Sequence, residues 1–159
     1  KDLLESDPGL IILRAYTKMY AVPGVRFGWC MTADAALIEK LYHAGQPWNV
    51  SVIAQACAVA AANEPDWAAE TAKRIAEERR FLSDGLAACG LTVFPGEANF
   101  LLFRSNDTGL HEKLAEHGIM IRNCDNYRGL SAGYYRVAVK TREASKCLLN
   151  AIKLIIENG

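Results

Sequence analysis

The pattern of hydrophobic and polar positions along this chain predicts strands and helices in alternation. The continuous apolar run at residues 10–13 is typical of a buried strand, and residues 26–32 alternate as in a second strand. Longer segments show the apolar spacing of helices. We expect helices at residues 33–43, 51–62, 66–89, 108–117 and 142–157, and further strands at residues 91–94, 99–104, 119–122 and 134–139. This order is typical of an α/β fold in which helices cover a sheet.

Turn and cap signals indicate where several of these elements end. Thr32 is the expected N-cap of the helix at residues 33–43. Gly90 and Gly118 are expected to end the helices that precede them. The Asn63-Glu64-Pro65 segment is the best candidate for a domain boundary.

Composition and charge argue against several classes of function. The chain has 159 residues, 51% of them hydrophobic, and a formal net charge of zero. This is enough apolar material for a sizeable core, and no basic stripe favours a nucleic-acid partner. No apolar run approaches the ~20 residues that span a bilayer. The five cysteines and three histidines lack metal-ligand spacing, so we expect no metal site, reduced thiols and a cytoplasmic protein.

The most informative segment is residues 14–29, which read Arg-Ala-Tyr-Thr-Lys-Met-Tyr-Ala-Val-Pro-Gly-Val-Arg-Phe-Gly-Trp. Lys18 follows a strand end, and Arg26 comes eight residues later, across the Pro23-Gly24 turn. A lysine amine can form a Schiff base with a carbonyl, and an arginine fork binds a phosphate in pairs of hydrogen bonds. The two side chains therefore suit one ligand that carries both groups.

This segment resembles the cofactor-lysine signature of the class I and II aminotransferases, the fold-type I enzymes that use pyridoxal 5'-phosphate. The resemblance implies that Lys18 attaches the cofactor covalently and takes part in catalysis, and that Arg26 binds the cofactor phosphate. The family usually has a serine three residues before the lysine, whose hydroxyl also contacts that phosphate. Ala15 stands there in this chain, and Thr17 is the nearest remaining hydroxyl.

A second pair of cationic residues lies near two later strands. Arg122 ends the predicted strand at residues 119–122, and Arg136 lies within the next one. If those strands pair, the two guanidiniums can converge and bind a substrate with two anionic groups. The family resemblance implies that Arg136, in the pattern Arg136-Val137-Ala138-Val139, binds the substrate α-carboxylate. It further implies that Arg122 contacts a substrate phosphate and that Asn99 lies near the substrate.

The finer resemblance is to the enzymes with phosphorylated substrates. Residues 121–130 and 134–139, and the segment at residues 46–51, are similar to L-threonine-O-3-phosphate decarboxylases of cobalamin biosynthesis. This implies decarboxylation of L-threonine O-3-phosphate to aminopropanol phosphate. A histidinol-phosphate aminotransferase, the aminotransferase-like sensor domain of a transcription regulator, and a non-catalytic relative kept for dimerisation stay open as alternatives.

The resemblance covers essentially the whole chain and corresponds to the C-terminal half of such enzymes. It implies that residues 1–62 end the large domain that binds pyridoxal phosphate. Residues 63–159 would form the small α+β C-terminal domain, with helices on a short, mainly antiparallel sheet and with the linking helix included. We expect a fragment that is inactive alone, and a homodimer in the full-length protein.

Overall fold

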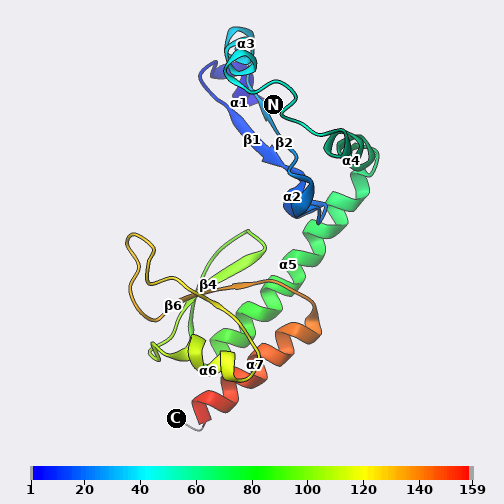
Figure 1. Cartoon of the computed structure of the whole chain (residues 1–159). Helices are drawn as coiled ribbons and strands as arrows, with labels where there is room; N and C mark the ends of the chain where they lie inside the picture. The colour runs from blue at the N-terminus through cyan, green and yellow to red at the C-terminus, as the bar shows by residue number, and fades with distance from the viewer. Residues whose placement is uncertain (1, 158–159) are drawn as a thin grey trace. The chain divides into compact units, whose positions relative to one another are not determined.

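The computed structural model describes residues 2–157, which form two compact units that meet between Ala72 and Lys73 in the sequence (Figure 1). Each unit is described by itself. The helix α5 (Pro65–Ala88) contains the point where the division falls. It matches the long helix predicted at residues 66–89, and Gly90 follows it with a φ of 78°, as expected of a helix-ending glycine.

The first unit has a two-stranded antiparallel ribbon with short helices around it. The strand β1 (Ile12–Ala15) pairs with β2 (Gly28–Met31), so that Ala15 lies opposite Gly28. Between the two strands come the short helix α2 (Tyr16–Met19) and a 3-10 turn, η1 (Pro23–Val25). The unit is completed by α1 (Asp2–Ser6), α3 (Ala35–Ala44) and α4 (Val52–Ala62).

The helix caps of this unit correct one prediction from the sequence. The Ser51 hydroxyl accepts a hydrogen bond from the Ala54 amide at 3.1 Å and so caps α4. The cap of α3 is Asp34, whose carboxylate accepts from the amides of Ala36 and Leu37. The prediction of Thr32 as the cap was wrong by two residues, because the Thr32 hydroxyl accepts from the Asp34 amide instead.

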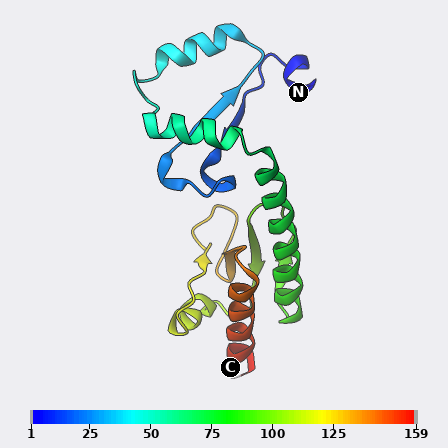
Figure 2. The same ribbon diagram turned by 90° about the vertical axis from the view of Figure 1, so that its right-hand side faces the viewer.

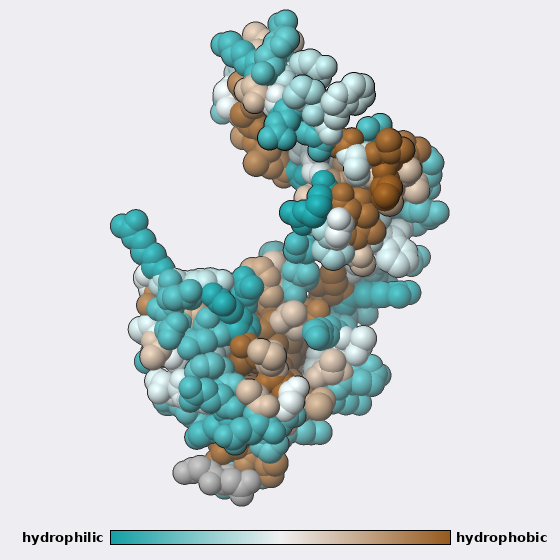
Figure 3. Space-filling view, in the orientation of Figure 1, coloured by the Kyte–Doolittle hydropathy of each residue, from teal (hydrophilic) through white to brown (hydrophobic). Residues whose placement is uncertain are grey.

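Much of the apolar surface of the first unit is exposed. Leu13 is 77% exposed, so the expectation of a buried strand was wrong: within the unit, a two-stranded ribbon leaves its faces largely uncovered. Side chains of α4 are exposed as well, and Figure 3 shows hydrophobic residues gathered on the surface there. Among the described residues of this unit, Ala54 is the one hydrophobic side chain that is fully buried.

The second unit is an antiparallel sheet with helices on one face (Figure 2). Its strand order is β3-β4-β6-β5, and the helices are α5, α6 and α7. Side chains from these elements form a core that includes Leu82, Phe103, Leu114, Tyr135 and Ile152. The remaining bounds are Thr92–Phe94 (β3), Phe100–Arg104 (β4), Arg122–Asn123 (β5), Tyr134–Ala138 (β6), Leu110–Glu116 (α6) and Arg142–Glu157 (α7).

The strand predicted at residues 119–122 was mostly wrong. The structure has a strand only at Arg122–Asn123, because the residues before it complete the end of α6. Gly118 has a φ of 72°, and the Ile119 amide donates to the Leu114 carbonyl at 2.9 Å. The last helix, in contrast, has the bounds predicted from the pattern. Within residues 2–157, each helix is too short or too polar to cross a bilayer.

Gly133, just before β6, is a position where the backbone requires glycine. Its φ is 90°, and a Cβ there would lie 2.6 Å from the carbonyl oxygen of Ser105. We predict that Gly133→Ala lowers the free energy of unfolding by about 2 kcal/mol or more. Gly96→Ala is the control, since a Cβ at Gly96 meets nothing within 4 Å. Equal denaturant midpoints for the two variants of the full-length protein would contradict this prediction.

Candidate active site

Lys18 lies in the short helix that follows β1. The aromatic ring of Tyr16 packs against the rings of Tyr20 and Phe27, with centroids 4.7 and 5.3 Å apart, and the Tyr16 amide donates to the Phe27 carbonyl. These contacts fix the backbone of the segment that carries the lysine. The Lys18 side chain itself is exposed, and its Nζ lies 3.5 Å from the hydroxyl of Thr17. The amine is therefore accessible from a backbone that is held in place.

Arg26 ends the turn η1 in the left-handed region, with φ 59° and ψ 47°. This conformation is unfavourable for a residue with a side chain, and such residues are frequent at functional sites. The exposed guanidinium donates to the Pro23 carbonyl at 3.0 Å. A primary amine, a hydroxyl and a guanidinium thus lie on the connection between two paired strands. This donor set is suited to a phosphorylated aldehyde such as pyridoxal phosphate.

Ala15 occupies the N-cap of the lysine helix, and that helix has no side-chain cap. The backbone of Ala15 is extended, with φ −145° and ψ 146°, which is the conformation that a serine at an N-cap also adopts. We predict that Ala15→Ser in the full-length protein tightens pyridoxal phosphate binding by about threefold or more, through a further hydrogen bond. Titration of the apoprotein with the cofactor measures this. Ala15→Val, which has no hydroxyl, is the control, and equal affinities for the two variants would contradict the prediction.

Arg122 and Arg136 lie directly opposite each other on the paired strands β5 and β6. The two strands therefore pair, as convergence of the two guanidiniums requires, and the backbones of the two arginines are neighbours across the pair. Residues directly opposite each other in a sheet project to the same face, and neighbours along a strand project to opposite faces. Tyr135 belongs to the helix-covered core, so the two arginines lie on the open face of the sheet.

Aromatic and amide side chains flank both guanidiniums. The Cζ of Arg136 lies 4.9 Å from the centroid of the Phe100 ring, and that of Arg122 lies 5.9 Å from the Tyr127 ring. Arg122 also donates to the side-chain oxygen of Asn126 at 3.3 Å. These contacts orient the two cations. Sequence reasoning missed the roles of Tyr127 and Asn126, because nothing in the pattern indicates that this loop returns onto Arg122.

A third arginine, Arg104, also lies on the open face and was missed. It pairs with Tyr134 across the β4–β6 ladder, and its Cζ lies 5.7 Å from the Tyr134 ring. Burial alternates along Phe100–Arg104, with Leu101 and Phe103 buried, but the sequence Phe-Leu-Leu-Phe-Arg is a continuous apolar run that does not show which face Arg104 takes. Arg104 therefore lies on the same face as the arginine pair but at a different aromatic ring, Tyr134.

Asn99 immediately precedes β4 and is exposed. Its carbonyl accepts a hydrogen bond from the Val139 amide at 2.9 Å, which ties it to the segment after β6. The next residue is Phe100, whose ring lies at Arg136. Asn99 is therefore hydrogen-bonded to the segment that follows Arg136, and it directly precedes the residue whose ring contacts Arg136.

The Cys124 thiol next to Arg122 is fully buried. Burial raises the pKa of this thiol, and the positive charges of Arg136 and Arg122 act in the opposite direction. A buried thiol with a raised pKa stays neutral near pH 7, so we assign Cys124 to packing rather than to nucleophilic chemistry.

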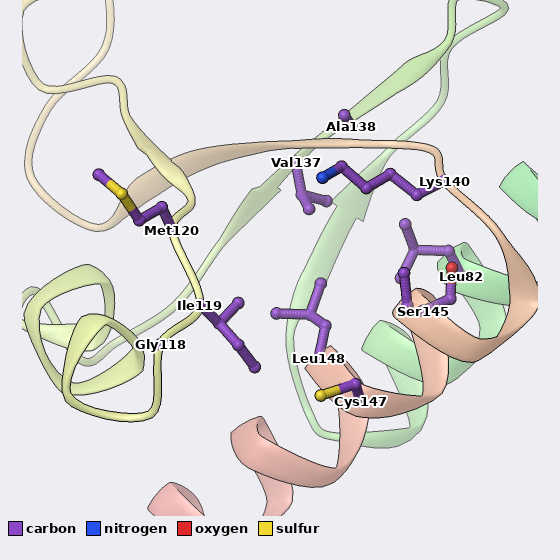
Figure 4. Close-up of a pocket in the computed structure, with 11 residues that line it drawn as sticks. Leu82, Gly118, Ile119, Met120, Val137, Ala138, Lys140, Ser145, Cys147 and Leu148 are labelled. Carbon is purple, nitrogen blue, oxygen red and sulfur yellow. The ribbon is translucent and has the colours of Figure 1, made fainter.

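A pocket of about 250 Å³ lies on the helix-covered face of the same sheet (Figure 4). The side chains of Ile119, Val137 and Leu148 point toward one another in it. Ser145 contributes a buried hydroxyl without a hydrogen-bond partner among the described residues. Val137 follows Arg136 and so projects away from the open face. This mostly apolar pocket is separate from the arginine pair.

Comparison with known proteins decides the family. The sequence pattern of the family described as aminotransferase class I and II matches residues 1–152. The chain belongs to this family. The threonine-phosphate decarboxylase of Salmonella typhimurium is 35% identical over 156 residues, which cover 96% of this chain and 43% of that protein. A histidinol-phosphate aminotransferase of Nitratidesulfovibrio vulgaris is 31% identical, covering 98% and 42% of the two chains.

Solved structures agree with the fold. The crystal structure of the histidinol-phosphate aminotransferase from Clostridium acetobutylicum superposes with a TM-score of 0.93 at 29% identity, covering 99% of this chain and 49% of that one. The fold is therefore that of the fold-type I aminotransferases, as predicted. The chain spans less than half the length of the curated relatives named above. Lys18, Arg26 and Thr17 lie in its first unit, and Asn99, Arg122 and Arg136 lie in the second.

Proposed function

We propose that the full-length protein is a pyridoxal-phosphate-dependent enzyme that decarboxylates L-threonine O-3-phosphate. The observation that carries this proposal is the direct register pairing of Arg122 with Arg136. L-Threonine O-3-phosphate has a carboxylate and a phosphate only a few bonds apart. Two guanidiniums on directly opposed residues suit such a compact ligand, since opposed Cα atoms in a sheet are about 4.5–5.5 Å apart.

In this proposal the residues of the first unit hold the cofactor. Lys18 attaches it covalently, and Arg26 binds its phosphate, with the Thr17 hydroxyl as a further donor. Bound pyridoxal phosphate supplies an electron sink for the negative charge that develops at the substrate Cα. The Lys18 amine would also be the base and acid that holds or delivers a proton at the substrate Cα.

The residues of the second unit orient the substrate. Arg136 binds the α-carboxylate, Arg122 binds the phosphate, and Asn99 lies near the substrate. Together they would fix the rotation of the substrate about its Cα, and this rotation would select the bond that breaks. The angle at which the two anionic ends are held therefore decides between loss of CO2 and loss of a proton.

We further propose that residues 1–62 end the large cofactor-binding domain and that residues 63–159 form the small domain. Asn63-Glu64-Pro65 separates α4 from the long helix α5 and supports this division. The full-length protein is proposed to be a cytoplasmic homodimer that acts in corrinoid side-chain synthesis, where aminopropanol phosphate is needed. These points rest on the family resemblance.

A histidinol-phosphate aminotransferase is the second candidate, favoured by the similarity to the Clostridium acetobutylicum structure. Its phosphorylated substrate carries one anionic group, the phosphate, and no carboxylate. Histidinol phosphate would leave one of the two arginines without an anionic partner, and the carboxylate of the 2-oxo acid would bind that arginine only in the other half-reaction. L-Threonine O-3-phosphate, in contrast, uses both arginines at once. This difference is the reason for preferring the decarboxylase.

The test uses the full-length protein loaded with pyridoxal phosphate and given L-threonine O-3-phosphate, with and without a 2-oxo acid. Release of CO2 that needs no oxo acid supports the decarboxylase. Absence of CO2, together with amino transfer from histidinol phosphate to the oxo acid, would overturn it in favour of the second candidate.

A further inference from the structure

Arg79, in the middle of α5, is joined to the loop that leads into β4. Its side chain is 13% exposed. Its Nη1 donates to the carbonyls of Glu97 and Ala98 at 2.9 and 3.2 Å, and its Nη2 donates to the Glu97 carboxylate at 3.0 Å. One guanidinium therefore binds two consecutive carbonyl groups and a side chain of the same loop.

This loop ends at two residues that belong to the proposed substrate site. Asn99 follows Ala98 directly, and the ring of Phe100 lies 4.9 Å from the Arg136 guanidinium. Phe100 also lies opposite Ala138 in the ladder, and the Asn99 carbonyl accepts from Val139. The position of the loop thus affects both Asn99 and the ring against which Arg136 rests.

We infer that Arg79 is a positioning residue for substrate binding. It fixes the segment 95–98 and thereby the placement of Asn99 and Phe100, without touching the substrate itself. The inference rests on the proposed function, because it assigns Asn99 and Arg136 to the substrate. Sequence patterns do not show it, since Arg79 looks like any charged residue of an amphipathic helix.

The two carbonyl groups carry the restraint, and the carboxylate contributes little. The Glu97 side chain is 98% exposed, so its ion pair with Arg79 is screened by water. The carbonyl bonds come from a guanidinium that is mostly buried, and they act on the backbone directly. Arg79 also has the fork needed to bind several acceptors at once, which lysine lacks.

The experiment compares variants of the full-length, cofactor-loaded protein by steady-state kinetics with L-threonine O-3-phosphate and by hydrogen exchange. Arg79→Ala is expected to raise KM about 10-fold and to change kcat much less, because positioning of substrate groups is lost. Amides in the segment 95–101 are expected to exchange about 10-fold faster. Arg79→Lys is expected to restore part of both effects, and Glu97→Gln to produce neither.

Arg80→Ala is the matched control, since it removes the same charge from the next, exposed position of α5. Unchanged KM and exchange in Arg79→Ala, or equal changes in Arg80→Ala, would overturn the inference. If Arg79→Ala does not fold, Arg79→Lys decides, because slightly raised KM and faster local exchange are expected there too. A wild-type protein without activity toward L-threonine O-3-phosphate would refute the proposed function. Amide hydrogen exchange needs no substrate, so it would still measure whether Arg79 restrains the loop.

Discussion

Replacing Lys18 by alanine in the full-length protein is expected to abolish covalent attachment of pyridoxal phosphate and to lower turnover by about 1,000-fold or more. Lys18 is exposed on a short helix whose backbone is fixed by the packing of Tyr16. In the proposed function, its removal takes away the attaching amine and the proton-transfer group together. Both effects come from one side chain, so they should be lost in parallel.

Reduction with borohydride followed by peptide mass analysis measures the attachment directly. The wild-type protein should carry the reduced cofactor on the peptide that contains Lys18, and Lys18→Ala should carry none. Lys40→Ala, at an exposed lysine of α3, is the control and should label and turn over like the wild type. A label on a lysine other than Lys18 would refute the assignment.

The second large effect is expected at Arg136. Replacement by alanine should lower kcat/KM for L-threonine O-3-phosphate by about 100-fold or more, because a charge-assisted, paired contact with the carboxylate is lost. Arg136→Lys should restore only part of this loss, since an ammonium cannot reproduce the paired geometry. Steady-state kinetics of the full-length protein provides the measurement.

Arg104→Ala is the matched control for Arg136. It removes an arginine from the same open face, where Arg104 lies at the Tyr134 ring, without removing a proposed substrate contact. Its kcat/KM should stay within about threefold of the wild type, as expected when only a long-range charge is lost. An effect as large as that of Arg136→Ala would mean that the overall charge of the face matters, and not a specific contact.

Sequence reasoning predicted most of the second unit because its signals are local. The apolar run at the start of Phe100–Arg104 and the helical spacing of Arg142–Glu157 predict a strand and a helix, and the structure confirms both elements. Ile119 was misassigned because its apolar side chain suits a strand, while its amide completes the end of α6. Hydrophobic patterns do not show how backbone amides are used.

The candidate site was less accessible to sequence reasoning than the fold. Lys18 and Arg26 lie in one short motif, and its resemblance to the family signature made both of them candidates. Arg122 and Arg136 lie opposite each other because β5 pairs with β6, and the sequence alone does not show which strands pair. Arg79 binds a loop 18 residues away, and nothing in its neighbourhood in the sequence indicates this contact. Such long-range contacts of polar groups come from the tertiary structure.

The central claim is that the opposed pair of arginines selects a substrate with two anionic groups. The most direct test is the kcat/KM of the full-length protein for L-threonine O-3-phosphate compared with L-threonine. The phosphate should raise kcat/KM by about 100-fold or more, and Arg122→Ala should remove most of that advantage, because a site built to bind a group discriminates strongly against its absence. Equal turnover of the two substrates, or an advantage that survives in Arg122→Ala, would contradict the claim.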